Sequence, residues 1–362
     1  MEWKLVEKTL LIGTYQQKQH LEGVIAGFDL DGTIIKPKYN KKRFTDKDKK
    51  TDWEFFSGDV KSKLQSLHHN KYKIIFVTNQ MGKIDIEIWK HRIENVLQKI
   101  NLPITIYCAL ADDGFRKPRT NIMNKYINYD KEKSFYCGDA GGRIGDFADT
   151  DRKFAINLGI NFYTPDNFFD GHEERDYIIK YPAFPDRITL PNKYIDVVLQ
   201  LQPYLNKKLM VLLVGFPSCG KSHFANRYLF NFQIINQDKL KTLNNCLKLT
   251  KQSIEKKKNL VIDNTNLTLE TRKTWIDLAK QNKYKVVVIW FQTPFELCLH
   301  NNYLRNFTSS VPSIKKIVYY TMRKRFVEPT LEEGCDTIIT TNFYFDANEG
   351  LNDSEIYYRY YY

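Results

Sequence analysis

Cysteine pairs and long apolar runs are both missing from this 362-residue chain. The six cysteines form no CxxC pair, which argues against a zinc site or a disulfide framework and for a reducing compartment. No apolar run approaches the roughly 18–20 residues that span a bilayer, and the start Met1-Glu2-Trp3-Lys4 lacks a signal-peptide pattern. We therefore expect a soluble monomer of the nucleus or cytoplasm with no membrane partner.

The composition is that of an ordered protein with an excess of positive charge. Apolar residues make up 42% and charged residues 27%, as in ordinary globular domains. At about 100–200 residues per domain, the length indicates two domains. The net charge of +13 favours a polyanionic partner such as nucleic acid. Biased codon usage is the alternative explanation of the lysine-rich and asparagine-rich composition.

Short apolar segments alternate with helix-like segments along the whole chain. This alternation predicts an α/β protein with two doubly wound parallel sheets, whose ligands lie beyond the carboxyl ends of the strands. We predict strands over residues 24–28, 74–77, 209–214, 260–262 and 286–291, and helices over residues 85–100 and 270–281.

Three segments interrupt this alternation. The charged stretch 170–191 contains three prolines and is interpreted as the interdomain connection, which gives domains 1–180 and 192–362. The basic run 36–50 lacks periodicity, and we favour a solvated loop there over a specific DNA contact. The tyrosine-rich end, residues 357–362, is interpreted as a disordered tail to which the sequence assigns no function.

The first candidate site follows the apolar segment 24–28. Asp29-Leu30-Asp31-Gly32-Thr33 places two carboxylates at positions i and i+2 of a loop at a strand end. One carboxylate can act as a nucleophile and form an aspartyl-phosphate, while the other exchanges a proton with the leaving alcohol and with water. A solvated turn rich in Asp and Gly is the structural alternative.

Further polar residues follow at later strand ends. Thr78 and Asn79 come directly after the segment 74–77, Lys117 offers a cation for a phosphate, and Asp139 offers a carboxylate suited to Mg²⁺. Each has an ordinary alternative as a helix cap, a surface charge or a turn residue. Four such residues in order make a phosphatase site the better explanation.

This order of motifs resembles the haloacid dehalogenase superfamily of phosphatases. The residues around these motifs are similar to those of the polynucleotide kinase 3′-phosphatase family. The similar segments are Thr78-Asn79-Gln80-Met81-Gly82, Phe115-Arg116-Lys117-Pro118 and Cys137-Gly138-Asp139-Ala140-Gly141-Gly142-Arg143. The resemblance implies that Asp29 is the nucleophile and Asp31 the acid/base, and that Thr78, Asn79 and Lys117 bind phosphate. It further implies that Asp29, Asp139 and the Asp31 carbonyl hold Mg²⁺, oriented by Asp146 or Asp151.

The second candidate site is a glycine-rich loop after the apolar segment 209–214. The loop matches GxxxxGK[ST], in Gly215-Phe216-Pro217-Ser218-Cys219-Gly220-Lys221-Ser222. In such a P-loop, backbone N–H groups cradle the phosphates of ATP. The lysine reaches the β- and γ-phosphates, and the Ser222 hydroxyl binds Mg²⁺. An unrelated glycine-rich turn is the alternative, and the preceding strand disfavours it.

Candidate acceptor-side residues follow the P-loop. Asp238 and Asp263 each follow a predicted strand, and either carboxylate could take the proton of an acceptor hydroxyl or serve as an ordinary strand-end cap. Arg305 lies on a predicted lid, where arginine stabilises charge on the transferring phosphoryl group. These segments are also similar to the kinase half of the polynucleotide kinase 3′-phosphatase family, which implies that Asp238 is the general base. That family usually has Arg where this chain has Gln237.

The resemblance covers residues 23–345 and has the phosphatase first, as in the DNA-repair type. It implies removal of 3′-phosphates and ATP-dependent phosphorylation of 5′-hydroxyls at DNA or RNA ends, which a ligase would then join. The segment before Gly23 is too short for the phosphopeptide-binding domain of vertebrate relatives, so we expect that domain to be absent. A metabolic phosphatase/kinase fusion and an inert nucleic-acid-binding protein are the rival hypotheses. The Lys, Asn, Ile and Tyr bias suggests an AT-rich genome, viral or protist.

Overall fold

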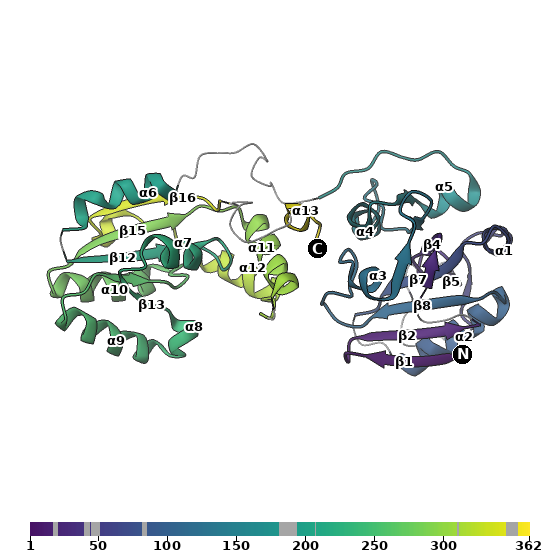
Figure 1. Cartoon of the computed structure of the whole chain (residues 1–362), viewed down its shortest axis with the longest axis horizontal. Helices are drawn as coiled ribbons and strands as arrows, with labels where there is room; N and C mark the ends of the chain where they lie inside the picture. The colour runs from purple at the N-terminus through teal and green to yellow at the C-terminus, as the bar shows by residue number, and fades with distance from the viewer. Residues whose placement is uncertain are drawn as a thin grey trace. The chain divides into compact units, whose positions relative to one another are not determined.

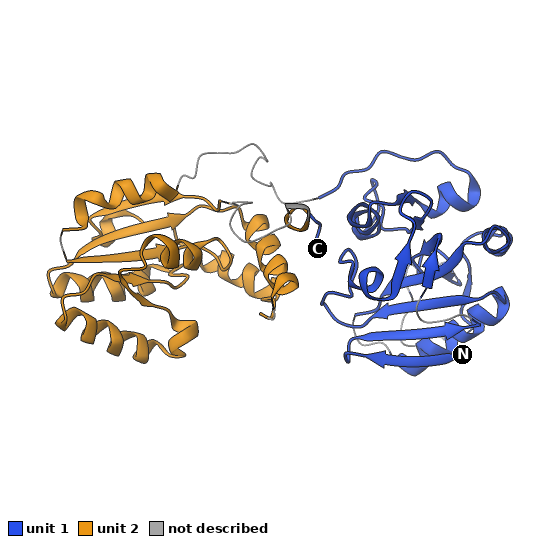
Figure 2. Ribbon diagram, in the orientation of Figure 1, with its two compact units in different colours: residues 1–181, 359–362 blue, residues 182–358 orange. Residues whose placement is uncertain are grey.

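The chain folds into two compact units. The computed structural model describes residues 1–16, 21–39, 44, 51–81, 85–180, 194–206, 208–309, 311–344 and 354–362. Unit 1 comprises residues 1–181 together with 359–362, and unit 2 comprises residues 182–358 (Figure 2). We expected the second domain to continue through residue 362, so the grouping of Arg359–Tyr362 with the first unit is a difference from the sequence analysis.

Unit 1 is built on a seven-stranded sheet with a parallel centre (Figure 1). Strands β8, β7, β4, β10 and β11 run parallel, whereas β1 and β2 join the β8 edge in antiparallel pairing. The order across the sheet is β1 (Glu2–Val6), β2 (Leu10–Tyr15), β8 (Ile104–Ala109), β7 (Lys73–Asn79), β4 (Ile25–Phe28), β10 (Phe135–Cys137) and β11 (Asn161–Tyr163). The predicted strands 24–28 and 74–77 are confirmed, but the antiparallel edge was not predicted.

Helices cover both faces of this sheet because its strands are apolar on both sides. Phe28 and Phe76 face the cluster that contains α1 (Val60–His69), α2 (Ile86–Ile100) and α5 (Pro165–Asp170). Their neighbours Ile75 and Val77 face α3 (Asn121–Tyr126) and α4 (Thr150–Leu158) on the other side. Two small pairs complete the unit, β3 (Leu21–Gly23) with β9 (Ile127–Tyr129) and β5 (Ile35–Pro37) with β6 (Trp53–Phe55).

Unit 2 is built on a five-stranded sheet that is parallel throughout. Its order is β13 (Gln233–Ile235), β14 (Leu260–Ile262), β12 (Leu209–Val214), β15 (Lys285–Phe291) and β16 (Thr337–Thr341). The predicted strands 209–214, 260–262 and 286–291 are confirmed. The predicted fold class, two α/β domains with parallel sheets, is therefore confirmed.

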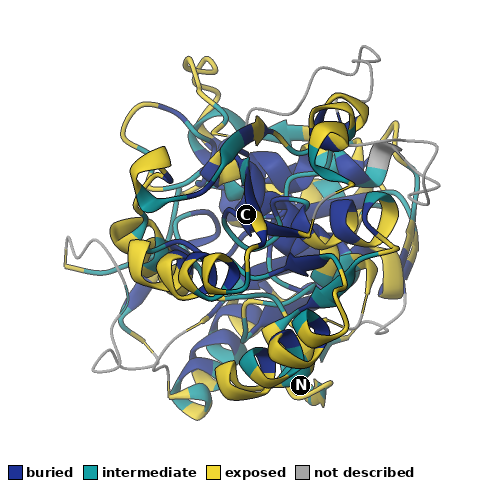
Figure 3. Ribbon diagram, turned by 90° about the vertical axis from the view of Figure 1, so that its left-hand side faces the viewer, coloured by how far each residue is buried: buried dark blue, intermediate teal, exposed yellow. Residues whose placement is uncertain are grey.

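The sheet of unit 2 also lies between helices. Met210 and Leu212 share one cluster with α9 (Leu243–Glu255) and α10 (Leu269–Gln281). On the opposite face, Tyr194 of α6 (Tyr194–Leu201) contacts Phe224 of α7 (Lys221–Tyr228). The strands are buried while the outer helix surfaces are exposed (Figure 3). The remaining helices are α8 (Gln237–Leu240), α11 (Phe295–Thr308), α12 (Lys316–Arg325), α13 (Ser354–Tyr357), η1 (Gln202–Tyr204) and η2 (Leu331–Glu333).

The predictions for the three segments that interrupt the alternation of strands and helices compare differently with the structure. Residues 171–180 contain no helix, and residues 181–193 of the expected connection lie outside the described residues. Residues 40–43 and 45–50 of the basic run also lie outside them. The expectation of a disordered tail was wrong for Tyr357 and Tyr361, whose side chains are buried in the described structure. No helix among the described residues has the length and apolar character to cross a membrane.

A buried ion pair joins α10 to η2 in unit 2. Arg272 of α10 is fully buried, and its Nε and Nη2 donate to Glu333 at 2.7 and 2.5 Å. Nη1 of the same guanidinium donates to the carbonyls of Asn266 and Val327. The pair therefore joins α10, the loop after β14 and the segment around residue 327.

Removing the positive partner should strongly destabilise unit 2. In Arg272→Met, the buried Glu333 carboxylate loses its counter-charge, which typically costs about 3–5 kcal/mol. Lys285→Met, which removes the exposed pair with Asp336, is the control and should change little. The measurement is amide hydrogen exchange of peptides from β12 and β14. Equal exchange protection in the two variants would show that the buried pair does not stabilise unit 2.

Candidate active sites

The first site begins where β4 ends and the chain turns over the sheet edge. The Asp29 N–H donates to the Cys137 carbonyl at 2.8 Å, which extends the pairing of β4 with β10 by one residue. Gly32 has a φ of 85°, and a Cβ there would lie 2.3 Å from Oδ2 of Asp139. Glycine is therefore required both for the left-handed turn and for the close approach of Asp139.

Lys117 is the central cation of this site. Its ammonium group lies 2.6 Å from Oδ1 of Asp29, 2.7 Å from Oδ1 of Asp151 and 2.7 Å from the Tyr136 hydroxyl. Only 3% of the residue is exposed. Burial lowers the pKa of Lys117, but Asp151 and Asp29 more than offset this effect and leave the pKa raised. The side chain is therefore a fixed positive charge beside Asp29.

Thr78 and Asn79 end the neighbouring strand β7 at the same edge, and Gln80 follows directly. The Thr78 hydroxyl is buried and accepts a hydrogen bond from the Gln80 amide at 3.1 Å. Asn79 donates to the Lys117 carbonyl and accepts from the Lys117 N–H, at 3.1 and 2.9 Å. Both ends of the Asn79 amide are thus occupied by the Lys117 backbone, so in this structure Asn79 positions the lysine.

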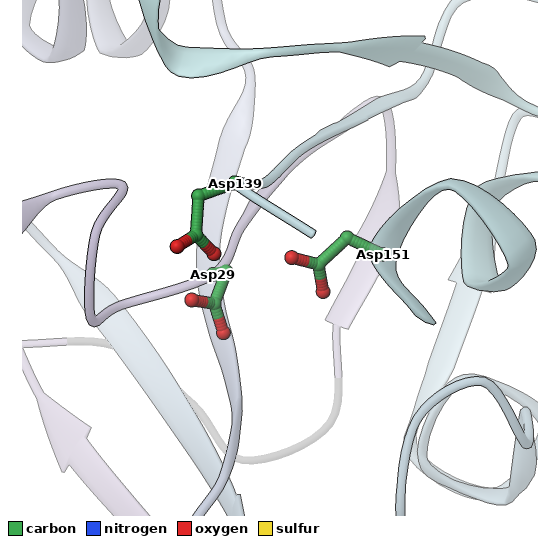
Figure 4. A group of neighbouring side chains, drawn as sticks. All are labelled: Asp29, Asp139 and Asp151. Carbon is green, nitrogen blue, oxygen red and sulfur yellow. The ribbon is translucent and has the colours of Figure 1, made fainter. Parts of the chain in front are cut away.

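Three carboxylates gather around Lys117. One oxygen each of Asp29, Asp139 and Asp151 lies within 4.8 Å of the others, and their side chains converge from β4, from the loop after β10 and from α4 (Figure 4). Burial, opposed by Lys117, raises the pKa of Asp29 to about 7, and burial together with Asp29 and Asp151 raises that of Asp139 to about 9. The site thus holds more carboxylates than its single lysine compensates, which suits a divalent cation.

Asp31 has a different environment from Asp29. The Gln80 amide donates to its Oδ2 at 2.5 Å, while its Oδ1 is buried without a hydrogen-bond partner in the described structure. Burial raises the pKa of Asp31, which favours its protonated form at higher pH than in water. The two carboxylates of the motif therefore differ in their partners, since Asp29 faces the Lys117 ammonium and Asp31 accepts from the neutral Gln80 amide.

Asp146 and Asp151 were alternatives in the sequence analysis, and the structure separates them. Asp151 lies in the carboxylate cluster and also accepts from the Ala140 N–H at 3.1 Å. Asp146 accepts from the N–H groups of Gly141 and Arg143 and pairs with the Arg143 guanidinium at 3.0 Å. Asp146 therefore stabilises the loop after Asp139 from outside the cluster.

The structure adds residues that the sequence analysis did not assign. The Tyr136 hydroxyl donates to the Val77 carbonyl at 2.8 Å and accepts from Lys117, so it links the lysine to the backbone of β7. Tyr136 stands one residue before Cys137 in a quoted motif, but nothing in its spacing distinguishes it from a core tyrosine. A cavity of about 680 Å³ opens over the carboxylates, and Gln80, Arg92 and Arg116 contribute polar groups to its wall.

The second site is the loop between β12 and α7. Gly215 (φ 153°) leaves the strand, and α7 begins at Lys221 directly after Gly220 (φ 101°). The Lys221 ammonium group turns back into the loop and donates to the carbonyls of Gly215 and Phe216, at 2.9 and 2.7 Å. A strand, a glycine-rich loop and a helix N-terminus in this order form the phosphate-binding arrangement of other proteins.

Ser222, Asp263 and Asn236 form one hydrogen-bonded group beside this loop. The Ser222 hydroxyl donates to Oδ2 of Asp263 at 2.7 Å, and the Asn236 amide donates to the same oxygen at 2.9 Å. Asp263 is buried and follows β14, while Asn236 follows β13. Three strand ends therefore meet at the P-loop serine. The sequence analysis did not assign Asn236 to the site.

Two helices brace the P-loop from its other side. The Asn301 amide of α11 donates to the Ser218 carbonyl at 3.1 Å, and the Tyr319 hydroxyl of α12 donates to the Pro217 carbonyl at 3.1 Å. The Thr293 hydroxyl donates to the Cys219 carbonyl at 3.2 Å. These contacts fix the backbone of the P-loop at three successive carbonyls.

Asp238 and Arg305 lie at more open positions. Asp238 is exposed in the first turn of α8, one residue after Gln237, whose N–H donates to the Asn264 side chain at 2.9 Å. Arg305 is exposed on α11. Burial raises the pKa of the Tyr319 hydroxyl, and the charge of Arg305 opposes part of this rise. The proximity of Arg305 to Tyr319 places it on the side of the P-loop that Tyr319 contacts.

Comparisons with known proteins agree with these two sites. Residues 24–169 match the family model described as polynucleotide kinase 3 phosphatase, and residues 210–329 match a model described as an AAA domain. A bifunctional polynucleotide phosphatase/kinase of Schizosaccharomyces pombe is 36% identical over 353 residues, covering 93% of this chain and 84% of that protein.

Two further relatives are similar in different ways. A putative bifunctional polynucleotide phosphatase/kinase of Acanthamoeba polyphaga mimivirus is 36% identical, covering 96% of this chain and 91% of that protein. A polynucleotide 3′-phosphatase of Arabidopsis thaliana is 30% identical over 196 residues, covering 46% of this chain and 27% of that protein. Two of these relatives match nearly the whole chain, with the carboxylate site in the first half and the P-loop in the second, and the chain belongs to the bifunctional polynucleotide phosphatase/kinase family.

Proposed function

We propose that unit 1 removes the 3′-phosphate of a nucleic-acid strand end and that unit 2 phosphorylates a 5′-hydroxyl end with ATP. A broken strand with two unligatable ends would then carry the 3′-hydroxyl and 5′-phosphate that a ligase joins. The observation that carries this proposal is the coexistence, in one chain of this family, of a buried aspartate–lysine site and an intact P-loop. The net charge of +13 fits a polyanionic substrate.

In the phosphatase reaction, Asp29 acts as the nucleophile and Asp31 as the acid and base. An oxygen of Asp29 attacks phosphorus, the bond from phosphorus to the 3′-oxygen breaks, and Asp31 gives its proton to that oxygen. Water then attacks the aspartyl-phosphate, Asp31 takes the proton, and Asp29 and inorganic phosphate are released. Lys117 and the Thr78 hydroxyl hold the phosphate oxygens, and Asn79 and Tyr136 keep Lys117 in place.

Mg²⁺ is the proposed metal at both sites. In unit 1, Asp29, Asp139 and the Asp31 carbonyl would hold it, and in unit 2 the Ser222 hydroxyl would, with Asp263 behind it. When bound, the cation neutralises charge on the transferring phosphoryl group. The crowding of Asp29, Asp139 and Asp151 against one lysine fits a divalent cation, because in its absence burial raises the pKa of Asp29 to about 7 and that of Asp139 to about 9.

In the kinase reaction, the P-loop backbone and Lys221 hold the phosphates of ATP. Asp238 takes the proton of the 5′-hydroxyl, whose oxygen attacks the γ-phosphorus as the bond to ADP breaks. Arg305 stabilises the charge that develops on the phosphoryl group. The exposure of Asp238 supports its role as a base for a large substrate, whereas Asp263 is buried and already accepts from Ser222 and Asn236.

The direct test is an assay on labelled oligonucleotides with defined 3′-phosphate and 5′-hydroxyl ends, with DNA beside RNA. Turnover of both ends is the expected result. Higher activity on free sugar phosphates and nucleosides would identify a metabolic phosphatase/kinase instead, and binding without turnover would identify an inert nucleic-acid-binding protein.

The two activities should be lost separately. Asp29→Asn removes the nucleophile and should lower 3′-phosphatase activity by roughly 10³-fold or more, the scale of such losses elsewhere. Lys221→Ala should abolish 5′-kinase activity in the same way. Each variant should retain the other activity, because the residues belong to different units. Loss of both activities in either folded variant would contradict the assignment of one site to each unit.

Metal binding should stabilise unit 1 more as the pH rises. The folded pKa values of Asp29 and Asp139, about 7 and about 9, exceed the unfolded value of 3.8, so the metal-free folded state binds extra protons and loses stability as pH rises through this window. Mg²⁺ competes with those protons. Its stabilising shift of the melting temperature should therefore be larger near pH 8 than near pH 6.

A matched pair of variants controls this measurement. Asp139→Asn should remove most of the shift, whereas Asp176→Asn, an exposed aspartate of unit 1, should keep it. A shift that is the same at both pH values, or that survives Asp139→Asn, would rule out this carboxylate cluster as the metal site.

Asp238 and Asp263 should differ in their kinetic effect. A positioned base is typically worth about 10²–10⁴ in rate, so Asp238→Asn should lower kcat by about that factor and leave ATP binding nearly unchanged. Asp263→Asn should instead raise the Mg²⁺ concentration that the kinase needs, since Asp263 holds Ser222. Asp277→Asn, an exposed aspartate on α10, is the control. Near-normal kcat for Asp238→Asn with a lost kcat for Asp263→Asn would reverse the assignment.

A further inference from the structure

The segment Arg359–Tyr362, here called the tyrosine segment, is part of unit 1 (Figure 2). Its backbone is bound by side chains of that unit. The Tyr360 N–H donates to Oδ1 of Asn157 at 2.8 Å, and Nδ2 of Asn157 donates to the Tyr360 carbonyl at 2.7 Å. Nε of Arg119 donates to the Tyr361 carbonyl and Nζ of Lys153 to the Tyr362 carbonyl, both at 2.9 Å.

The side chains of the tyrosine segment are also packed. Tyr361 is only 2% exposed. The Lys153 ammonium lies 5.6 Å from the ring centre of Tyr360 and 5.8 Å from that of Tyr362, within the range of cation–π attraction. Arg119 and Lys153 are themselves buried, with 5% and 3% exposure. Four hydrogen bonds to its backbone and one buried ring show that this segment occupies a specific binding site on unit 1, here called its seat.

That seat consists of two elements that also build the phosphatase site. Lys153 and Asn157 belong to α4, whose first turn carries Asp151. Arg119 follows Lys117 by two residues, and Nδ2 of Asn157 also donates to the Pro118 carbonyl at 2.8 Å. The tyrosine segment thus binds both α4 and the loop 117–119 at the point where Asn157 joins them.

We propose that the tyrosine segment is a positioning element of the phosphatase site, which fixes Lys117 between Asp29 and Asp151 by tying the loop 117–119 to α4. Asn79 holds the Lys117 backbone on the side of β7. On the side of α4, the tyrosine segment accepts from Arg119 of the loop and is bound to Asn157, which itself donates to Pro118. Because a misplacement of about 1 Å can cost about 10²-fold in rate, a loosened loop should weaken catalysis without unfolding the unit. This inference rests on the proposed role of Lys117.

The main experiment replaces Arg359–Tyr362 with Gly-Ser-Gly-Ser in the full chain. We expect the 3′-phosphatase kcat/KM to fall by about tenfold or more. The inhibition constant of inorganic phosphate, which reports phosphate binding by Lys117, should rise with KM, and 5′-kinase activity should remain. Adding the peptide Arg-Tyr-Tyr-Tyr should restore part of the phosphatase activity.

Point variants test which groups of the segment and of its binding site are needed to position the loop. Tyr361→Ala empties the buried seat and should reproduce the loss, whereas Tyr361→Phe keeps the ring and should remain near normal. Asn157→Asp removes the amide donor to both Pro118 and Tyr360 and should also reproduce it. Asn161→Asp, the same change at an exposed position of β11, should have no effect.

Two results would overturn the proposal. One is a Gly-Ser-Gly-Ser variant with unchanged kcat, KM and phosphate inhibition constant. The other is a variant in which only the fraction of active enzyme falls, with KM and the phosphate inhibition constant unchanged, because that shows a purely structural role. Lys117→Met is measured alongside: if it keeps normal activity, the assignment of Lys117 fails, whereas an inactive Lys117→Met with a neutral tyrosine segment contradicts this inference alone.

Discussion

The ammonium group of Lys117 is the interaction on which the first site depends. It lies within 2.7 Å of Asp29, Asp151 and the Tyr136 hydroxyl, in a place with almost no access to water. Buried carboxylates without a partner are strongly disfavoured, so this one cation allows several of them to share a small volume. Its backbone, held by Asn79 on one side and joined through Pro118 to Asn157 on the other, is accordingly fixed from two elements.

The two candidate sites carry opposite charges in excess. Unit 1 crowds carboxylates around one lysine, which raises the pKa of Asp29 and Asp139 and leaves room for a cation. Unit 2 turns Lys221 back into the P-loop, and the buried carboxylate beside that loop, Asp263, is held by Ser222 and Asn236. Both sites lie where parallel strands end, since only there can residues distant in sequence reach a common centre.

The sequence predicted what is local and missed what depends on packing. The strand 209–214, the P-loop and the residues Asp29, Asp31 and Lys117 follow from apolar runs and short motifs, which are patterns of neighbouring residues. The antiparallel strands β1 and β2 were missed because their place in the sheet depends on pairing with β8, about a hundred residues away in the sequence. Asn79 was assigned to phosphate, but its amide holds the Lys117 backbone, a contact across 38 residues that spacing cannot indicate.

The same limit explains the tyrosine segment. Tyr360, Tyr361 and Tyr362 form a low-complexity run with no periodicity, which in sequence is typical of a tail. The specific contacts come from the part of unit 1 that binds the segment, where Arg119, Lys153 and Asn157 donate to successive carbonyls of the segment. Because those bonds go to backbone atoms, the identity of the segment's side chains gives little indication in the sequence that the segment is bound. Only Tyr361 is buried, and its ring fixes the register in which the carbonyls meet their donors. A segment recognised through its backbone can therefore position a catalytic loop while its sequence shows no motif.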